Sequence, residues 1–332
     1  MNKPLLTVVT TTYNQEKYIE ETIKSIVSQQ TNFKFRYIIS NDNSTDNTKM
    51  IIEKYKKEYP DIIEVINRKE NLGAMKNFVE TLNLVDTKYL ALCDGDDFWI
   101  DELKLQKQVD FLEKNDKYNI CFHKTLIFFE NKSKHETIYP EKACDLTLKD
   151  ELKENIIPAN SVVYRWQFSK KDSLKKNFPT NMVPGDHYLH LLHLKNGKKA
   201  KCLDEVMSKY RRHENGMWWL TSDVDKQILF HLKNGELLLN FYKNLIKEFN
   251  LSNKYFFNEM RYITAKTTEA YIKNNAFDKL YEFHKENKEL VELCIKEITF
   301  NKEMTPFQRK LYLFMFENKI FRQKLKSKIF KK

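Results

Sequence analysis

Short apolar runs alternate with segments of helical periodicity along the N-terminal part of the chain. Residues 5–10 form an apolar, β-branched run, which predicts a buried strand. Aliphatic side chains then recur at helical spacing at Ile19, Ile23 and Ile26, with Asn14 expected to cap that helix. Further strands are predicted at 35–40, 62–66 and 89–93, with helices after residue 46 and over 73–84. This order predicts a mostly parallel sheet with helices on both faces.

The rest of the chain is predicted to be mixed and then helical. Strands are indicated at 118–129 and 161–165, and residues 199–211 predict either a strand pair or one bent strand. From about residue 221 to 300 the spacing is strongly helical, without proline. We therefore expect an α/β domain at 1–220, with halves at 1–105 and 106–220, followed by a helical region at 221–332.

The cysteines and the apolar runs of the sequence indicate where the protein is located and which structural sites it lacks. The five cysteines are odd in number, scattered and without a CxxC pair, so neither a disulfide framework nor a zinc site is expected. No run of about 18 apolar residues predicts a membrane-spanning helix, and the N-terminus lacks the pattern of a secretory signal. We expect a cytoplasmic protein in a reducing compartment.

The formal net charge of +11 is concentrated at the C-terminal end. Residues 307–332 hold nine basic residues and one acid, a net +8, so the remaining 306 residues carry about +3. Apolar side chains interleave with these cations, which is typical of a helix on an anionic membrane surface. The alternative is a solvated or partly packed terminal helix. A nucleic-acid-binding protein would spread its cations over a binding face, so that function is disfavoured.

Three carboxylates crowd into four positions where the predicted strand at 89–93 ends. Asp94, Asp96 and Asp97 would repel one another, and burying them unpaired would be costly. A divalent cation would remove that conflict, because Mg²⁺ and Mn²⁺ prefer oxygen ligands and link protein carboxylates to substrate phosphates. The alternative is a polar turn built on the Asp94-Gly95 pair. The position favours a metal site, since ligands of such sheets bind at the carboxyl ends of the strands.

Polar segments also follow the other predicted strands. Residues 10–14 offer hydroxyl groups and a helix start, which would receive a nucleotide or its phosphate, or only cap the helix. After the second strand, Asp42 could accept hydrogen bonds from a base or ribose, whereas Asp46 is expected to cap a helix or tie the loop. After the third strand, Gly73 permits close approach of a ligand, and Lys76 could meet a phosphate.

Together these segments resemble family 2 glycosyltransferases in their order and separation. The matching residues are Thr11–Asn14, Asn41–Asp46, Asn71–Gly73 with Asn77, and Asp94–Asp97. The likeness covers residues 5–105 strongly and 106–218 more loosely. It implies the GT-A fold, a Rossmann-like mixed sheet with helices on both faces, here with an added C-terminal helical region.

The resemblance implies roles for individual residues. Asp42 would contact uracil or a similar base, and Asp94 and Asp96 would form the DxD pair, with Asp96 nearest the metal. Asp97 would contact the donor sugar or support the site. The donor-binding set that the resemblance implies also contains Thr11, Tyr13, Asn14, Asn71 and Lys76.

Residues 184–188 resemble the acidic motif at the start of an acceptor-side helix. Inverting members of the family place their general base there, which implies that Asp186 takes the proton of the acceptor hydroxyl. Many members carry Glu-Asp at this point, whereas this chain has Gly185-Asp186. Asp186 would also suit the N-cap of the helix.

Residues 207–218 resemble a motif that, in one bacterial branch of the family, closes over the donor pyrophosphate. In that motif Arg211 or Arg212 would stabilise phosphate charge. His213 would complete the metal site or contact the diphosphate, and Trp218 would cover the site or pack in the core.

The sequence therefore predicts an inverting glycosyltransferase that uses Mn²⁺ or Mg²⁺. It would move a sugar from a nucleotide-sugar, by resemblance a UDP-sugar, to a hydroxyl of a glycan or lipid-linked acceptor in bacterial surface polysaccharide or glycoconjugate synthesis. Residues 307–332 would bring it to the inner face of the plasma membrane. A nucleotidyltransferase is the main alternative, but no Gly-rich basic loop occurs early in the chain. A Rossmann oxidoreductase is disfavoured, because no GxGxxG follows the first strand.

Overall fold

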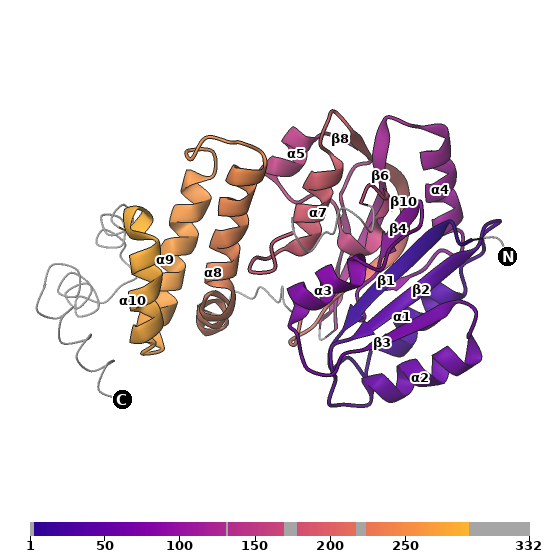
Figure 1. Ribbon diagram of the computed structural model, residues 1–332, viewed down its shortest axis with the longest axis horizontal. Helices are drawn as coiled ribbons and strands as arrows, with labels where there is room; N and C mark the ends of the chain where they lie inside the picture. The colour runs from indigo at the N-terminus through magenta and orange to yellow at the C-terminus, as the bar shows by residue number, and fades with distance from the viewer. Residues whose placement is uncertain (1–2, 131, 169–177, 217–223, 292–332) are drawn as a thin grey trace, which may run out of the picture. The chain divides into compact units, whose positions relative to one another are not determined.

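A computed structural model describes residues 3–130, 132–168, 178–216 and 224–291 of the chain (Figure 1). The chain divides into two compact units. The first comprises Met1–Thr180 and Pro184–Trp219, and the second comprises Asn181–Val183 and Leu220–Lys332. The sheet belongs to the first unit, and the second unit is helical.

The first unit is built on one mixed sheet, which has ten strands within the described residues (Figure 1). The strand order is β3-β2-β1-β4-β9-β6-β10-β5, with β7 paired to β6 and β8 paired to β10. The strands are β1 (Leu6–Thr12), β2 (Phe35–Asn41), β3 (Ile63–Asn67), β4 (Tyr89–Leu92), β5 (Phe98–Trp99), β6 (Tyr118–Phe129), β7 (Lys132–Tyr139), β8 (Asp145–Leu146), β9 (Val163–Arg165) and β10 (Lys199–Arg212).

The parallel half of the sheet confirms the prediction from the alternating pattern. Strands β3, β2, β1 and β4 run parallel, with Leu6 of β1 opposite both Phe35 and Tyr89. Strand β9 then runs antiparallel to β4 and β6, which makes the second half mixed. Strand β10 is one strand with register shifts between Lys199 and Ser208, so the chain adopts the bent strand and not the strand pair.

Helices cover both faces of the sheet, as predicted. Helices α1 (Ile19–Val27), α2 (Thr48–Glu58) and α4 (Lys104–Lys114) share a buried core with the sheet face that carries Ile39. Ser40 points to the opposite face, because successive side chains of a strand alternate. There its hydroxyl donates to Asn77 Oδ1 of α3 (Ala74–Leu82) at 2.6 Å. The other helical segments of this unit are α5 (Leu148–Lys153), the 3₁₀ turn Ala159–Ser161 and α7 (Gly185–His193).

Two local features differ from the sequence prediction. Asn14 does not cap α1, which begins at Ile19 with Tyr18 before it, and Asn14 instead forms a turn with a φ of 53°. Helix α5 was not predicted, because six residues are too few to show a helical period. Its start is fixed by the Thr147 N–H, which donates to the Asp150 carboxylate at 2.9 Å.

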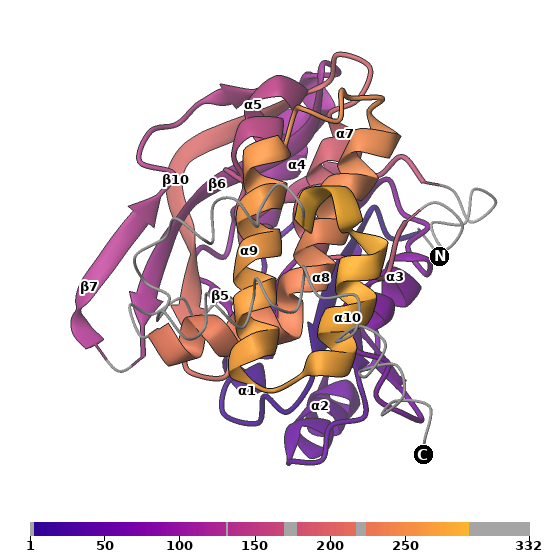
Figure 2. The ribbon, with the colours of Figure 1, turned by 90° about the vertical axis from the view of Figure 1, so that its left-hand side faces the viewer.

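The second unit is helical, as the sequence predicts. Helices α8 (Val224–Glu248) and α9 (Phe257–Lys273) pack side by side, with α10 (Phe277–Glu286) against α9 (Figures 1 and 2). Within the described ranges, no helix is long and apolar enough to cross a membrane. The basic segment 307–332 and Trp218 lie outside the described residues.

Candidate active site

The predicted nucleotide-binding loops lie at the carboxyl ends of the parallel strands and are tied to one another. The Thr10 hydroxyl donates to the Cys93 carbonyl at 2.6 Å, which joins the ends of β1 and β4. The Asn14 N–H donates to Ser44 Oγ at 3.0 Å, and Asn14 Oδ1 accepts from the Thr45 N–H at 2.8 Å. Asn14 therefore holds the loops after β1 and β2 together.

Asp46 and the neighbouring side chains of the loop after β1 complete this edge. Asp46 accepts from the Glu16 N–H at 3.1 Å and from the Thr48 N–H at 3.0 Å, so it ties the loop as predicted. Thr11 is half-buried, whereas Tyr13 is 46% exposed. The Tyr13 ring is thus open to a ligand at this edge.

Asp42 lies beneath the loop that follows β3. Its side chain is only 2% exposed, and its two carboxylate oxygens accept from the Leu72 N–H at 2.8 Å and the Gly73 N–H at 2.9 Å. Asn71 Oδ1 also accepts from the Gly73 N–H, at 3.0 Å. Asp42 and Asn71 therefore shape this turn, and Lys76 stands exposed in the first turn of α3.

The acidic turn Asp94–Asp97 is packed closely against α1 and the loop before it. A Cβ added to Gly95 would lie 2.4 Å from Gln15 Oε1 and 2.9 Å from Thr12 Oγ1, so the close approach requires glycine. The Thr22 hydroxyl lies 3.0 Å from the Gly95 carbonyl and 2.7 Å from the Asp97 carbonyl. These contacts fix the backbone that carries the three carboxylates.

Asp97 is the buried member of the acidic cluster. Its side chain is 1% exposed, and Oδ1 accepts from the Arg211 N–H of β10 at 2.9 Å. Burial raises the pKa of Asp97 well above its usual range, and the charges of Asp96 and Asp94 raise it further, while Arg211 opposes them. These contacts favour the supporting role for Asp97.

Arg211 braces the acidic turn. Its Nε donates to the Asp96 carbonyl at 3.0 Å, and its Nη2 pairs with Glu21 Oε2 of α1 at 2.5 Å. The guanidinium also lies 4.9 Å from the centre of the Phe128 ring. Arg212 is half-buried, and its Nε is buried without a hydrogen-bond partner among the described residues, so Arg212 is less engaged with the acidic turn than Arg211.

Asp96 and His213 are in direct contact. Asp96 Oδ2 lies 3.0 Å from His213 Nε2, and the imidazole is 3% exposed. The other ring nitrogen, Nδ1, is buried and has no hydrogen-bond partner within the described part of the chain. The ring packs on Tyr18 at 4.6 Å, and the Tyr18 hydroxyl donates to Glu130 Oε2 at 2.7 Å. The structure thus brings together two of the three predicted metal ligands.

Asp94 connects the acidic cluster to the predicted general base. The Asp94 side chain is exposed to solvent. Its pKa is nevertheless raised to about 8, first by the surrounding protein and then by the charges of Asp96 and Asp186. Solvent around Asp94 weakens the repulsion from the charges of Asp96 and Asp186, but the pKa of Asp94 is still raised above that of an ordinary aspartate. Asp186 is therefore near enough to act on Asp94, although the two are far apart in the sequence.

Asp186 lies in the first turn of α7, whose N-cap is Pro184, so Asp186 is not itself the N-cap. A Cβ on Gly185 would lie 2.7 Å from the side chain of Met75 in α3, so glycine lets α7 begin close to α3. The pKa of Asp186 is raised by burial, while His190 and the His187 backbone N–H oppose the shift.

The predicted metal ligands do not form a closed cage. Among the residues that the structure describes, no group of three or more His, Cys, Asp or Glu side chains is gathered to hold a metal. Mg²⁺ and Mn²⁺ are, however, often bound by one or two protein carboxylates together with substrate phosphates. Asp96 contacts His213, and the pKa of Asp94 is raised by burial and by its acidic neighbours. These two carboxylates fit a cation of that kind.

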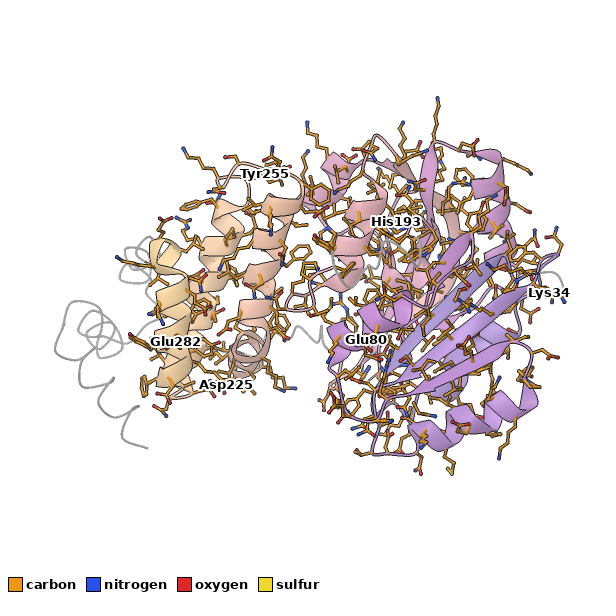
Figure 3. All side chains as sticks on the ribbon, viewed as in Figure 1. Lys34, Glu80, His193, Asp225, Tyr255 and Glu282 are labelled. Atoms are coloured by element: carbon orange, nitrogen blue, oxygen red, sulfur yellow. The ribbon has the colours of Figure 1, made fainter. Side chains whose placement is uncertain are left out.

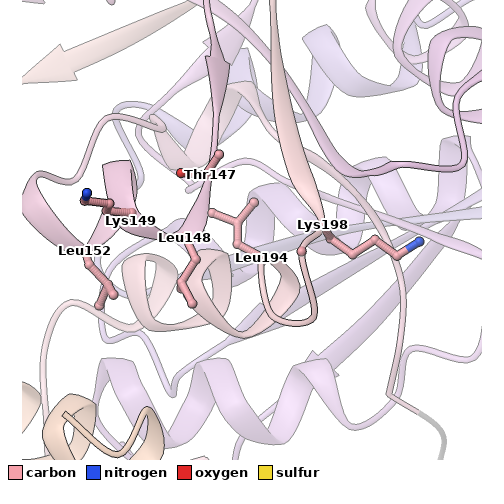
Figure 4. Close-up of a pocket in the computed structure, with 7 residues that line it drawn as sticks. Thr147, Leu148, Lys149, Leu152, Leu194 and Lys198 are labelled. Atoms are coloured by element: carbon pink, nitrogen blue, oxygen red, sulfur yellow. The ribbon is translucent and has the colours of Figure 1, made fainter.

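A pocket of about 300 Å³ lies elsewhere in the first unit (Figure 4). Leu148, Leu152 and Leu194 line it, together with Lys149 and Lys198. It lies at the C-terminal end of α7, while Asp186 stands at the N-terminal end. It contains none of the predicted site residues.

Sequence reasoning missed the residues that hold the site from α1. Thr22 fixes the acidic turn, and Glu21 pairs with Arg211, which is 190 positions away. Glu21 occupies an exposed polar position of the amphipathic helix α1, whereas Thr22 lies on its buried face. No local pattern distinguishes them, because their partners come from the acidic turn and from β10, far along the chain.

Comparisons with known sequences identify relatives. The sequence model described as Glycosyl transferase family 2 matches residues 7–172, half of the chain. The uncharacterized protein Mb1547 of Mycobacterium bovis is 40% identical over 214 residues, which cover 64% of this chain and 60% of that protein. The putative teichuronic acid biosynthesis glycosyltransferase TuaG of Bacillus subtilis is 27% identical over 258 residues, 74% of this chain and 98% of TuaG.

Solved structures share the fold. TarS 1-349 of S. aureus, in complex with UDP-GlcNAc, aligns with a TM-score of 0.51 at 17% identity, over 86% of this chain and 91% of TarS 1-349. The mannosyltransferase PcManGT from Pyrobaculum calidifontis, in complex with GDP-Man and Mn²⁺, aligns with a TM-score of 0.53 at 15% identity, over 83% and 76% of the two chains. The predicted GT-A-like fold with C-terminal helices is confirmed. The chain belongs to glycosyl transferase family 2.

Proposed function

We propose that this protein transfers a sugar from a nucleotide-sugar donor to a hydroxyl of a glycan or lipid-linked acceptor, with inversion at the anomeric carbon. The observation that carries the proposal is the contact between Asp96 Oδ2 and His213 Nε2, 3.0 Å apart, just after β4, with Asp186 among the charges that raise the pKa of Asp94. A general base for the acceptor and a group of carboxylates for the donor would then share one site at the carboxyl ends of the strands.

Different residues of this chain would remove the acceptor proton, support the acidic turn and bind the donor. Asp186, held at the start of α7, would take the proton of the acceptor hydroxyl as that hydroxyl attacks. Asp97 and Arg211 would keep the acidic turn rigid. Arg212 would meet the phosphates, and the loops that hold Thr11, Tyr13 and Asp42 would receive the nucleotide.

A divalent cation would bind at Asp96 and Asp94, with His213 as a further ligand or as a partner of Asp96. When bound, Mn²⁺ or Mg²⁺ would supply positive charge that offsets the charge developing on the departing diphosphate. The complex of PcManGT with GDP-Man and Mn²⁺ supports this assignment at the level of the shared fold.

UDP is the proposed nucleotide of the donor, which the complexes of TarS with UDP-GlcNAc and with UDP support at the level of the fold. The similarity to TuaG, named for teichuronic acid biosynthesis, supports an acceptor in surface polysaccharide synthesis. We further propose that the basic segment 307–332 brings the enzyme to the inner face of the plasma membrane.

Replacing Asp96 tests the proposal. Asp96→Asn keeps the shape of the side chain but removes the charge, and we expect sugar transfer to fall roughly 100-fold, about 3 kcal/mol of transition-state stabilisation. The measurement is kcat/KM for nucleotide-sugars with Mn²⁺, and NMR of the product reports the anomeric configuration. Asp110→Asn, on the exposed side of α4, is the matched control. Full activity of Asp96→Asn with every donor would exclude the assigned role.

A further inference from the structure

The side chain of Tyr18, just before α1, lies beside the acidic site but has no role in the mechanism described above. It makes no capping hydrogen bond to α1. The described side chains fill the first unit densely (Figure 3), and within this packing Tyr18 is only 8% exposed. The contacts of this buried ring therefore indicate what it supports.

Two side chains from the end of β10 rest on the Tyr18 ring. The Arg211 guanidinium carbon lies 4.8 Å from the centre of that ring, and the centre of the His213 ring lies 4.6 Å from it. Residues two positions apart in an extended segment point to the same face. Tyr18 therefore supports the face of this segment on which His213 contacts Asp96.

The hydroxyl of Tyr18 anchors the ring to the backbone that carries His213. It donates to Glu130 Oε2 at 2.7 Å, and the Glu130 N–H donates to the Arg212 carbonyl at 3.0 Å. The Gly216 N–H donates to the His213 carbonyl at 2.9 Å, which closes the turn that follows. Glu130 therefore holds the Tyr18 ring and the backbone beside His213 in a fixed relation.

The orientation of the His213 ring depends on this packing. Its Nε2 lies 3.0 Å from Asp96 Oδ2, whereas Nδ1 has no hydrogen-bond partner in the part of the chain that the structure describes. A single hydrogen bond does not fix the plane of an imidazole, so contact with the Tyr18 ring supplies a further restraint. Groups that orient a metal ligand from behind typically strengthen metal binding by about 10- to 100-fold.

We propose that Tyr18 is a positioning residue whose ring holds the His213 imidazole against Asp96 and so raises the affinity of this site for Mn²⁺. The inference rests on the proposed function, in which Asp96 and Asp94 bind a divalent cation. The effect of Tyr18 on the cation passes through His213, so it should disappear when the imidazole is removed.

The test is the Kd of Mn²⁺ for the full-length protein with UDP, measured from the loss of the EPR signal of free Mn²⁺ relative to UDP alone. Tyr18→Leu removes the ring that supports His213, so Kd should rise about 10-fold. Tyr18→Phe keeps the ring and should bind Mn²⁺ nearly as tightly as the wild type. In a His213→Ala background, Tyr18→Leu should change Kd no further.

Tyr55→Leu is the matched control. Tyr55 is 4% exposed, and its hydroxyl donates to Glu20 Oε1 at 2.7 Å, so it resembles Tyr18 in burial and in its carboxylate partner. It lies on α2, where its ring packs on that of Tyr59, with the ring centres 6.4 Å apart. This variant should have a lower Tm than the wild type and an unchanged Kd for Mn²⁺.

A wild-type Kd in folded Tyr18→Leu overturns the proposal, and so does Tyr18→Phe if it binds Mn²⁺ as weakly as Tyr18→Leu. A further loss of affinity when Tyr18→Leu is added to His213→Ala also contradicts it, because the ring would then act by another route. If Tyr18→Leu does not fold, Tyr18→Met takes its place, since its flexible side chain fills the space without a flat ring. A failure of the proposed function looks different, because the wild type itself would then bind no Mn²⁺ beyond that held by UDP alone.

Discussion

At the scale of the residue, environment and not sequence spacing decides what each carboxylate can do. Asp94, Asp96 and Asp97 are near neighbours in the chain, yet Asp97 is buried under Arg211, Asp96 touches His213, and Asp94 reaches solvent. The sequence indicated an acidic site because three like charges stood together. The charges alone could not separate their environments, which depend on Arg211 of β10 and on His213 just after it.

Lys104 is a second residue whose surroundings control its charge. The side chain is fully buried, its Nζ has no hydrogen-bond partner in the described chain, and it stands 4.1 Å from the Trp99 ring. Burial lowers its pKa from 10.5 to about 7. The π face of Trp99 favours the ammonium and offsets part of the cost.

We expect Lys104→Met to stabilise the protein most at pH 6 and least near pH 10. Between pH 7 and 10.5 the unfolded chain binds more protons at Lys104 than the folded chain, so wild-type stability rises with pH there. The variant lacks this term, and its gain at pH 6 is about 2 kcal/mol. Urea unfolding at both pH values measures it, with the exposed Lys49→Met as control. A gain that is equal at the two pH values would contradict the argument.

At the scale of the element, the alternating pattern predicted the parallel strands and their helices because each buries a regular apolar face. It was less informative for strand β10 and helix α5. The register of β10 shifts along β6, which breaks the two-residue period. Helix α5 is only six residues long. Asn14 resembled a helix cap, but its hydrogen bonds to the loop after β2 outweighed that local preference.

At Gly235, where α8 packs against α9, tight packing and helix propensity favour different residues. A Cβ on Gly235 would lie 2.0 Å from Thr267 Oγ1 and 2.9 Å from Thr267 Cβ. The Thr267 hydroxyl is also engaged, since it donates to the Ile263 carbonyl at 2.7 Å. A side chain at position 235 would therefore collide with Thr267, so glycine allows the close packing of α8 on α9 at this point.

Gly235→Ala should destabilise the protein by roughly 2 kcal/mol, because overpacking outweighs the helix propensity of alanine. Thermal unfolding of the variant measures the loss. The exposed Lys233→Ala serves as the control, and the double variant with Thr267→Ala should regain stability, since the methyl group then has room. A single variant more stable than wild type would show that the helices move apart freely.

At the scale of the whole molecule, ligand binding should be visible as stability. If the donor nucleotide binds with Mn²⁺, the folded state gains about 2.7 kcal/mol when UDP is present at 100 times its Kd. We expect a higher Tm with UDP and Mn²⁺ together than with either alone. Asp96→Asn should lose this difference. No shift with UDP, GDP or dTDP, with or without Mn²⁺, would argue against a metal-bound donor.

The distribution of charge predicts a membrane contact at the same scale. The segment 307–332 carries most of the net charge, and its interleaved apolar residues suit an anionic surface. Full-length protein should float with vesicles that contain anionic lipid, whereas a variant ending at residue 306 should not. Vesicles of neutral lipid are the control. Equal, negligible flotation of both proteins would remove the idea.

The brace formed by Arg211 has a consequence for synthesis of the chain. It links β10 to Glu21 of α1 and to the acidic turn, so contacts that complete this turn come from the far end of the first unit. While a ribosome is still making the chain, residues 5–105 can pair their strands, but Asp97 lacks its partner until residue 211 has emerged. The nascent chain should therefore bury and pair the Asp97 carboxylate only late in translation, long after α1 has fixed the backbone of the acidic turn.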